Sequence, residues 1–67
     1  MKAASSELDR IDRAILRELQ RDGRLANVEL SRRVGLSATP CLERVKRLEK
    51  SGYIKGYRAL VAPDKLA

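Results

Sequence analysis

The sequence predicts a mainly α fold in which three helices are followed by one C-terminal β-strand. Apolar residues recur at helical spacing in three segments between residues 8 and 50. Glycines separate those segments at places where helices commonly end. Residues 53–61 then change to β-branched and aromatic types in partial alternation, which is typical of a strand. With 67 residues, the chain is long enough for one domain with a small core.

The first helix is expected to begin at residues 8–9, with Asp9 as its N-cap, and to end at residues 22–23. The preceding segment, residues 1–7, is small and polar and is expected to be a disordered tail. The apolar stripe of this helix is formed by Leu8, Ile11, Ile15 and Leu19, with Leu16 beside it.

The second helix is expected to be short and to depend on its neighbours for stability. Asn27 is a good N-cap for a helix over residues 28–34, and Glu29 lies in the first turn, where the helix dipole favours an anion. Gly35 supplies the left-handed backbone that ends the helix.

The third helix is amphipathic and basic, and it runs to about residue 50. Either Ser37 or Thr39 caps it, and Pro40 falls in the first turn, where its missing N–H breaks no helical bond. Its apolar face is formed by Cys41, Val45 and Leu48, with Leu42 at the edge.

The charge of the chain favours an anionic partner. Lys and Arg number 15 against 9 Asp and Glu, so the net charge is +6. Residues 37–58 carry six basic and two acidic side chains, whereas residues 1–36 carry eight and six. The excess is concentrated on and after the third helix, and such an excess is typical of proteins that bind nucleic acid or a membrane surface.

The composition argues against an enzyme. The chain has no histidine and one cysteine, which removes the commonest general base, zinc fingers and most catalytic triads. No glycine-rich phosphate loop of recognised spacing occurs, so neither a metal nor a cofactor is expected. Cys41 is expected to be a buried small hydrophobe. No apolar run approaches a membrane-spanning length, and a cytoplasmic protein with no membrane partner is the default.

The order of elements indicates a helix-turn-helix, within a three-helix, winged-helix-like domain over residues 8–56. The motif covers about residues 27–46, pivots on Gly35 and places its second helix, about residues 38–50, in the major groove of double-stranded DNA. The residues expected to contact DNA are Asn27, Ser37, Ala38, Thr39, Pro40, Glu43, Arg44, Arg47 and Lys50.

Each residue type in that set suits a particular contact. Small side chains at the helix start let the backbone N–H groups approach phosphates and base edges. Arg44 and Arg47, one turn apart, suit guanine edges or phosphates. Glu43 either accepts from a cytosine amino group or pairs within the helix with Lys46 or Arg47.

The carboxylates of the chain are interspersed among arginines on the helices. This pattern suggests ion pairs rather than a catalytic acid and base.

Two other classes of function remain open on the residues alone. The domain could be a protein-interaction module, which an exposed apolar patch would favour. It could also bind RNA, or wrap DNA as an architectural protein that reads little sequence. The cationic outer face of the third helix favours a polyanion over a protein partner.

Beyond these patterns, the chain resembles the Lrp/AsnC (leucine-responsive regulator) family over essentially residues 8–67. The first similar run is Leu8-Asp9-Arg10-Ile11-Asp12-Arg13, which is followed by similar residues at 15–16 and 19–24. The second covers residues 27–37 and 39–45, and the third covers the helix exit and the linker start at residues 48–49 and 52–57. Ala38 departs from the proline often found at its position, which should loosen the helix start slightly.

The resemblance implies a sequence-specific transcriptional regulator of bacterial type that binds DNA as a dimer or higher oligomer. It implies that residues 57–67 form a linker toward an effector-binding α/β domain outside this chain, which takes an amino acid. It also implies that the linker strand, residues 57–61, pairs with the same strand of a partner subunit, which would satisfy a strand that has no partner here.

Overall fold

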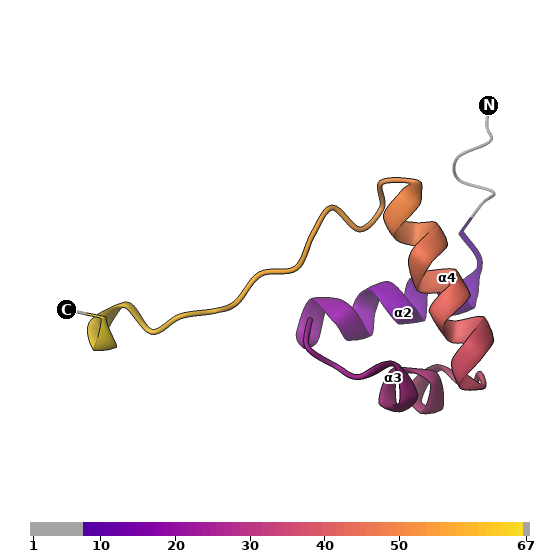
Figure 1. Cartoon of the computed structure of the whole chain (residues 1–67), viewed down its shortest axis with the longest axis horizontal. Helices are drawn as coiled ribbons and strands as arrows, with labels where there is room; N and C mark the ends of the chain where they lie inside the picture. The colour runs from indigo at the N-terminus through magenta and orange to yellow at the C-terminus, as the bar shows by residue number, and fades with distance from the viewer. Residues whose placement is uncertain (1–7, 67) are drawn as a thin grey trace.

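The computed structural model describes residues 8–66, and the disordered tail expected over residues 1–7 lies outside this range. Within it, α2 (Arg10–Arg21), α3 (Asn27–Val34) and α4 (Ala38–Lys50) are followed by a short 3-10 helix, η1 (Pro63–Lys65). In Figure 1, α4 lies across the other two helices, and it packs on both of them. The predicted arrangement of three helices is confirmed.

A capping box starts α2. The backbone N–H of Asp12 donates to Asp9 Oδ1 at 2.8 Å, and the backbone N–H of Asp9 donates back to Asp12 Oδ2 at 3.3 Å. This exchange satisfies two N–H groups that lack partners in the first turn of any helix. The prediction of Asp9 as the N-cap is confirmed.

The core is small and aliphatic. Its fully buried apolar side chains are contributed by all three helices: Ile15, Leu30, Cys41 and Leu48. Around them pack the partly buried residues Leu8, Ile11, Leu16, Leu19, Leu25, Val34, Leu36, Val45 and Ile54. Because helices of 8 to 13 residues are marginal alone, this shared core is what keeps them folded.

Cys41 has the structural role expected from its place on the apolar face. Its side chain is fully buried, and this burial raises the pKa of the thiol. A thiol that stays protonated is a poor nucleophile, so Cys41 acts here as a core side chain.

No helix in residues 8–66 has the length and hydrophobicity needed to cross a membrane.

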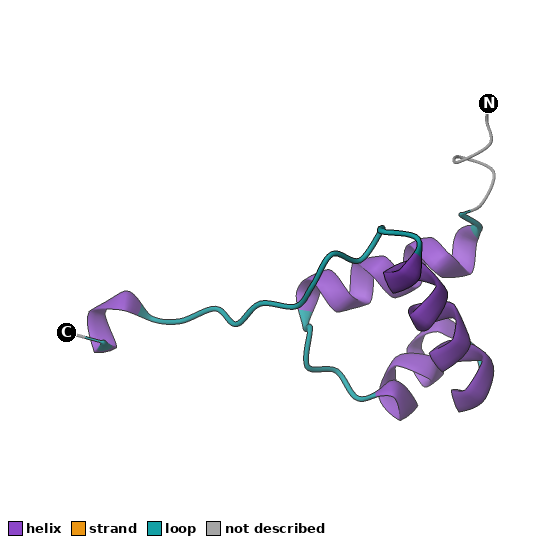
Figure 2. Cartoon of the chain, turned by 45° about the horizontal axis from the view of Figure 1, so that its top comes forward, coloured by secondary structure: helices purple, strands orange, loops and turns teal. Residues whose placement is uncertain are grey.

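After α4 the chain touches the core once more and then leaves it. The backbone N–H of Ile54 donates to the carbonyl of Leu48 at 3.1 Å, which confirms that this residue packs under the helices. The following segment runs away from the helices as an extended coil (Figure 2), and no strand is present in residues 8–66. A single segment cannot form the hydrogen-bonded ladder that defines a strand, so the linker strand remains a prediction that requires a partner.

Tyr57, farther along this extension, also contacts the helices. Its hydroxyl donates to Glu49 Oε2 at 2.7 Å, and its ring lies beside Gly23, at the end of α2. The ring lines a shallow hollow together with Leu19 and Leu42. Desolvation, together with the nearby Glu49 carboxylate, raises the pKa of Tyr57 to about 12.

We therefore predict that the Tyr57 phenol ionises near pH 12 rather than at its ordinary value of 10. The absorbance titration of the chain minus that of Tyr57→Phe isolates this group. Since folding raises the pKa, the contact stabilises the fold below the unfolded-state pKa, and the stabilisation is lost as the pH rises from about 10 to 12. Glu49→Gln, which keeps an acceptor but removes the charge, should lower the midpoint. A phenol that titrates at its ordinary value would contradict the contact.

Candidate nucleic-acid interface

The turn between α3 and α4 has the geometry that the sequence predicts. Gly35 has φ of 80°, in the left-handed region. Its backbone N–H donates to the carbonyl of Arg32 at 3.3 Å, and that of Leu36 donates to the carbonyl of Ser31 at 2.9 Å. These two bonds form a Schellman motif, which satisfies the last carbonyls of α3 and directs the chain into α4.

Asn27 has a different role from the predicted one. The cap position belongs to Ala26, whose backbone is extended, and Asn27 is already the first helical residue. Its amide Nδ2 instead donates to the carbonyl of Ala38 at 2.8 Å, which ties the start of α3 to the start of α4. The prediction of an Asn27 cap was therefore wrong. An asparagine side chain can accept from a local N–H or donate to a distant carbonyl, and the sequence alone does not show which of the two it does.

The N-terminal end of α4 is open to solvent. Ser37 occupies the cap position with an extended backbone but makes no side-chain capping bond. Pro40 lies in the first turn, as predicted. Ser37, Ala38, Thr39 and Pro40 are all exposed. Four small or rigid residues at an exposed helix start leave the backbone accessible to a large partner.

The outward face of α4 is a polar stripe, formed by Thr39, Glu43, Lys46 and Lys50. These residues are spaced i, i+4, i+7 and i+11, lie opposite Cys41 and Leu48, and are all exposed. Within residues 8–66, none of the stripe's three charged side chains forms an ion pair. The intrahelical pairing considered for Glu43 is therefore not observed in this range. Lys46 was absent from the predicted set of DNA contacts, but the helical period places it on the same stripe as Glu43 and Lys50.

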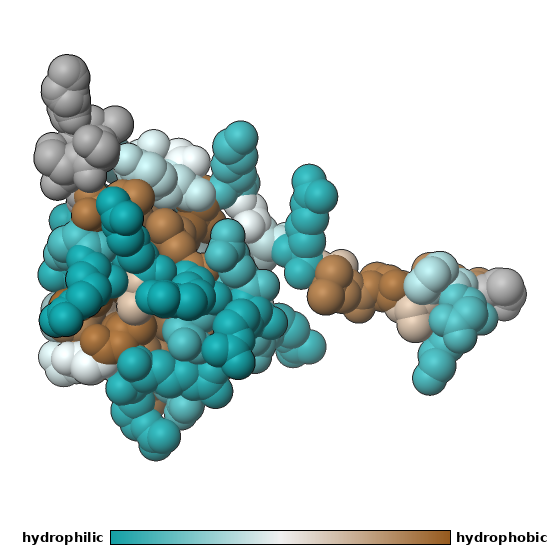
Figure 3. Space-filling view, turned by 180° about the vertical axis from the view of Figure 1, so that it is seen from behind, coloured by the Kyte–Doolittle hydropathy of each residue, from teal (hydrophilic) through white to brown (hydrophobic). Residues whose placement is uncertain are grey.

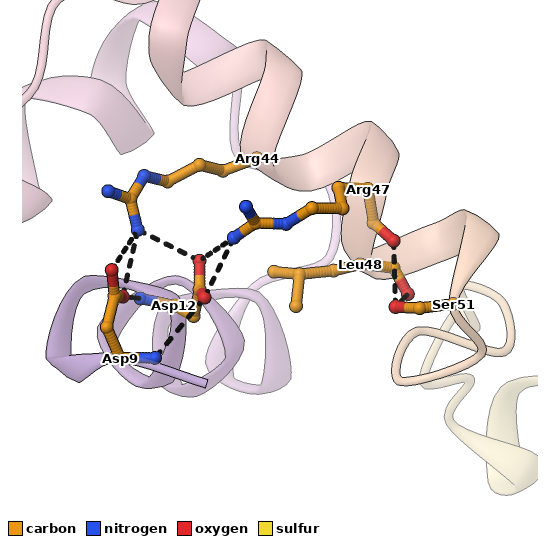
Figure 4. A network of polar contacts seen from close by, with 6 residues as sticks. All are labelled: Asp9, Asp12, Arg44, Arg47, Leu48 and Ser51. Atoms are coloured by element: carbon orange, nitrogen blue, oxygen red, sulfur yellow. Dashed lines mark hydrogen bonds and ion pairs between the residues drawn. The ribbon is translucent and has the colours of Figure 1, made fainter. Parts of the chain in front are cut away.

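Arg44 and Arg47 point elsewhere, toward the start of α2 (Figure 4). Arg44 Nη1 donates to Asp9 at 2.7 and 2.8 Å and to Asp12 Oδ1 at 3.1 Å. Arg47 Nη2 donates to the two oxygens of Asp12 at 2.9 and 3.0 Å. We call these four residues the Asp–Arg cluster.

The cluster contains a fully buried charge. The Asp12 side chain is 1% exposed, against 26% for Arg44 and 58% for Arg47. The backbone hydrogen bond from Asp12, and then the Arg44 guanidinium, hold the pKa of Asp9 below its ordinary value. Both acids of the cluster accept hydrogen bonds from a guanidinium, and charge-assisted bonds of this kind are shorter and stronger than bonds between neutral groups.

Other charged groups have local partners. Arg33 binds Glu18 on α2 and Glu29 on its own helix, each at 3.0 Å. Arg32 lies 3.6 Å from Glu29 and remains mostly exposed. Within residues 8–66, no three His, Cys, Asp or Glu side chains are grouped so that they could hold a metal ion.

Comparison with known proteins agrees with this geometry. The model of the winged helix-turn-helix DNA-binding family matches residues 8–55. Since this match covers well over half of the chain, the chain belongs to that family. The resemblance to Lrp/AsnC proteins is confirmed by the relatives that follow.

The leucine-responsive regulatory protein of Escherichia coli is 66% identical over 65 residues, which are 97% of this chain and 40% of that protein. A Neisseria meningitidis transcriptional regulator, solved with L-Met, is 52% identical with a TM-score of 0.85, over 88% of this chain and 38% of that one. An AsnC family regulator from Agrobacterium tumefaciens is 47% identical with a TM-score of 0.83, over 88% and 39%. The chain thus spans about two fifths of these relatives.

We predict that Gly35→Ala destabilises the domain by about 1–2 kcal/mol, the usual cost of a left-handed residue with a Cβ. No atom lies within 4 Å of the added Cβ, so the cost is backbone strain rather than a clash. Gly56→Ala is the matched control, since Gly56 also has open space but no positive φ. Urea unfolding of the three chains measures the difference. Equal stability of the two variants would show that the turn does not need a left-handed residue.

Proposed function

We propose that this chain is the DNA-binding part of a transcriptional regulator and that α4 enters the major groove of double-stranded DNA. The observation that carries the proposal is the exposed stripe of α4, on the second helix of a helix-turn-helix, whose cations form no ion pair within residues 8–66. In this motif that helix is the one that reads base edges.

The contacts follow from the position of each residue along α4. Ser37, Ala38 and Thr39, at the exposed helix start, bring backbone N–H groups close to a phosphate and let the helix approach the bases. Glu43, with no ion pair in the described range, accepts from a cytosine amino group. Lys46 and Lys50 neutralise phosphates, while Pro40 and Asn27 fix the start of the helix.

The predicted DNA contacts of Arg44 and Arg47 are less well supported than those of the stripe. Both guanidiniums bind carboxylates of α2. We therefore propose that these two arginines act mainly within the protein, by holding α4 against α2.

Effector response and localisation are proposed from the relatives, of which this chain spans about two fifths. Among the named relatives, the Escherichia coli protein is called leucine-responsive, and the Neisseria meningitidis regulator was solved with L-Met. We propose that this chain functions in the cytoplasm with an amino-acid effector that binds outside these 67 residues.

The alternatives are less well supported by the surface. A protein-interaction module would be expected to present an apolar patch on α4. The outward stripe of this helix is polar, and Leu42 is its one exposed large apolar side chain. An architectural binder with little sequence reading would not be expected to place the Glu43 carboxylate in the middle of its phosphate-binding face. A comparison of duplex DNA with duplex RNA, and of a selected site with a scrambled one, separates these functions.

The first test is fluorescence anisotropy on a random-sequence DNA duplex over a range of salt. Lys46→Ala and Lys50→Ala should each reduce the slope of log K against log salt by about 0.9, the value for one phosphate contact. Lys65→Ala has the same charge change on the C-terminal extension and should leave the slope unchanged. Absence of binding at low salt, or equal slopes in all variants, would refute the proposed face.

A homodimer is the second part of the proposal. The extension exposes Leu60 and Val61 to solvent, and Figure 3 shows apolar surface along it. Pairing of residues 57–61 with the same segment of a second copy would bury these side chains and supply the missing ladder.

Sedimentation equilibrium tests this pairing. The chain should show weak, concentration-dependent dimerisation, and Leu60→Pro should abolish it because proline cannot donate to a ladder. Leu66→Ala removes an exposed leucine outside the paired segment and should leave the association unchanged. A strictly monomeric mass at high concentration would exclude the linker dimer.

A further inference from the structure

The Asp–Arg cluster removes two cations of α4 from the charge that this helix offers to a partner. It contains two carboxylates and two guanidiniums, so it is neutral as a unit. Without the carboxylates from α2, the helix would carry the uncompensated charges of Arg44 and Arg47 beside those of its lysines. The partners come from residues that precede these arginines by 32 to 35 positions in the chain.

The geometry turns Arg44 in particular away from the proposed DNA face. At 100° per residue, Arg44 lies about 100–120° around the helix from Glu43 and Lys50 in the stripe. A single nitrogen of its guanidinium is bonded to three carboxylate oxygens, and its side chain is only about a quarter exposed. Reaching a phosphate on the stripe side would require these bonds to break.

We propose that Asp9 and Asp12 are specificity-determining residues because they withhold Arg44, and in part Arg47, from DNA phosphates. Phosphate contacts strengthen binding to every sequence equally, whereas base contacts distinguish sequences. By neutralising two arginines beside the recognition face, the carboxylates lower the sequence-independent part of the affinity, so that base contacts such as that of Glu43 make up a larger share of it. This inference rests on the proposed DNA-binding function.

Asp9 is the suitable residue for a test. Its side chain is half exposed, and Asn caps helices about as well as Asp, so Asp9→Asn retains the cap while it removes one carboxylate charge. Asp12 is less suitable because its carboxylate is buried. Asp64→Asn provides the matched control: it changes the net charge equally, in η1, and its carboxylate has no ion pair within residues 8–66.

The experiment measures affinity for a random-sequence duplex over a range of salt for the unmodified chain and both variants. Asp9→Asn should bind more tightly at low salt, with a slope of log K against log salt steeper by about 0.9. The ratio of its affinity to that of the unmodified chain should therefore fall about threefold between about 50 and 200 mM salt. Asp9→Glu, which restores a carboxylate, should return the slope to that of the unmodified chain. A purely structural role for Asp9 would weaken binding and leave the slope unchanged.

The outcomes separate this inference from the proposed function. Binding by all four chains, with equal slopes for Asp9→Asn and Asp64→Asn, would overturn the inference and leave the proposed function intact. Binding by Asp9→Asn alone would support the inference and overturn DNA binding by the unmodified chain. No binding by any chain at low salt would overturn both.

Discussion

The arrangement of the helices depends on one buried charge. The Asp12 carboxylate is removed from water near the start of α2, and such a group destabilises a fold unless its partners are in place. Those partners are the capping N–H of Asp9 and the guanidiniums of Arg44 and Arg47. Sliding or rotating α4 over α2 would separate the charges. The cluster therefore specifies one position for α4, whereas aliphatic packing alone tolerates several.

A second constraint fixes the other end of the motif. Gly35 reverses the chain, and the hydrogen bond from Asn27 to the carbonyl of Ala38 holds the two helix starts together. α4 is thus held near its N-terminus by α3 and along its middle by α2. A helix anchored at two places presents its outward stripe in a defined direction, which a reader of base edges requires.

The sequence was sufficient to predict the three helices because their signals are local. The Asp9 cap, the Gly35 turn and the apolar spacing of α4 each depend on residues within a few positions of one another, and all three are confirmed. The Asn27 contact could not be predicted, because its partner is 11 residues away. The same limit applied to Arg44 and Arg47: composition shows that acids are available, but not which cations they neutralise. Lys46 could have been found by extending the stripe from Glu43.

The C-terminal extension differs from the helices because part of its apolar surface stays exposed to solvent. Up to Tyr57, each segment has a contact that holds it: Ile54 bonds to the end of α4, and Tyr57 bonds to Glu49. Beyond that residue, Leu60 and Val61 are exposed. Removing their apolar surface from water would stabilise the protein by about 25 cal/mol per Å². A short extended segment cannot bury its own side chains, because successive residues point in opposite directions. The free energy available from burying Leu60 and Val61 is therefore not realised within residues 8–66. In the proposed dimer it would come from pairing with the second copy, and the Tyr57 contact would mark where that pairing begins.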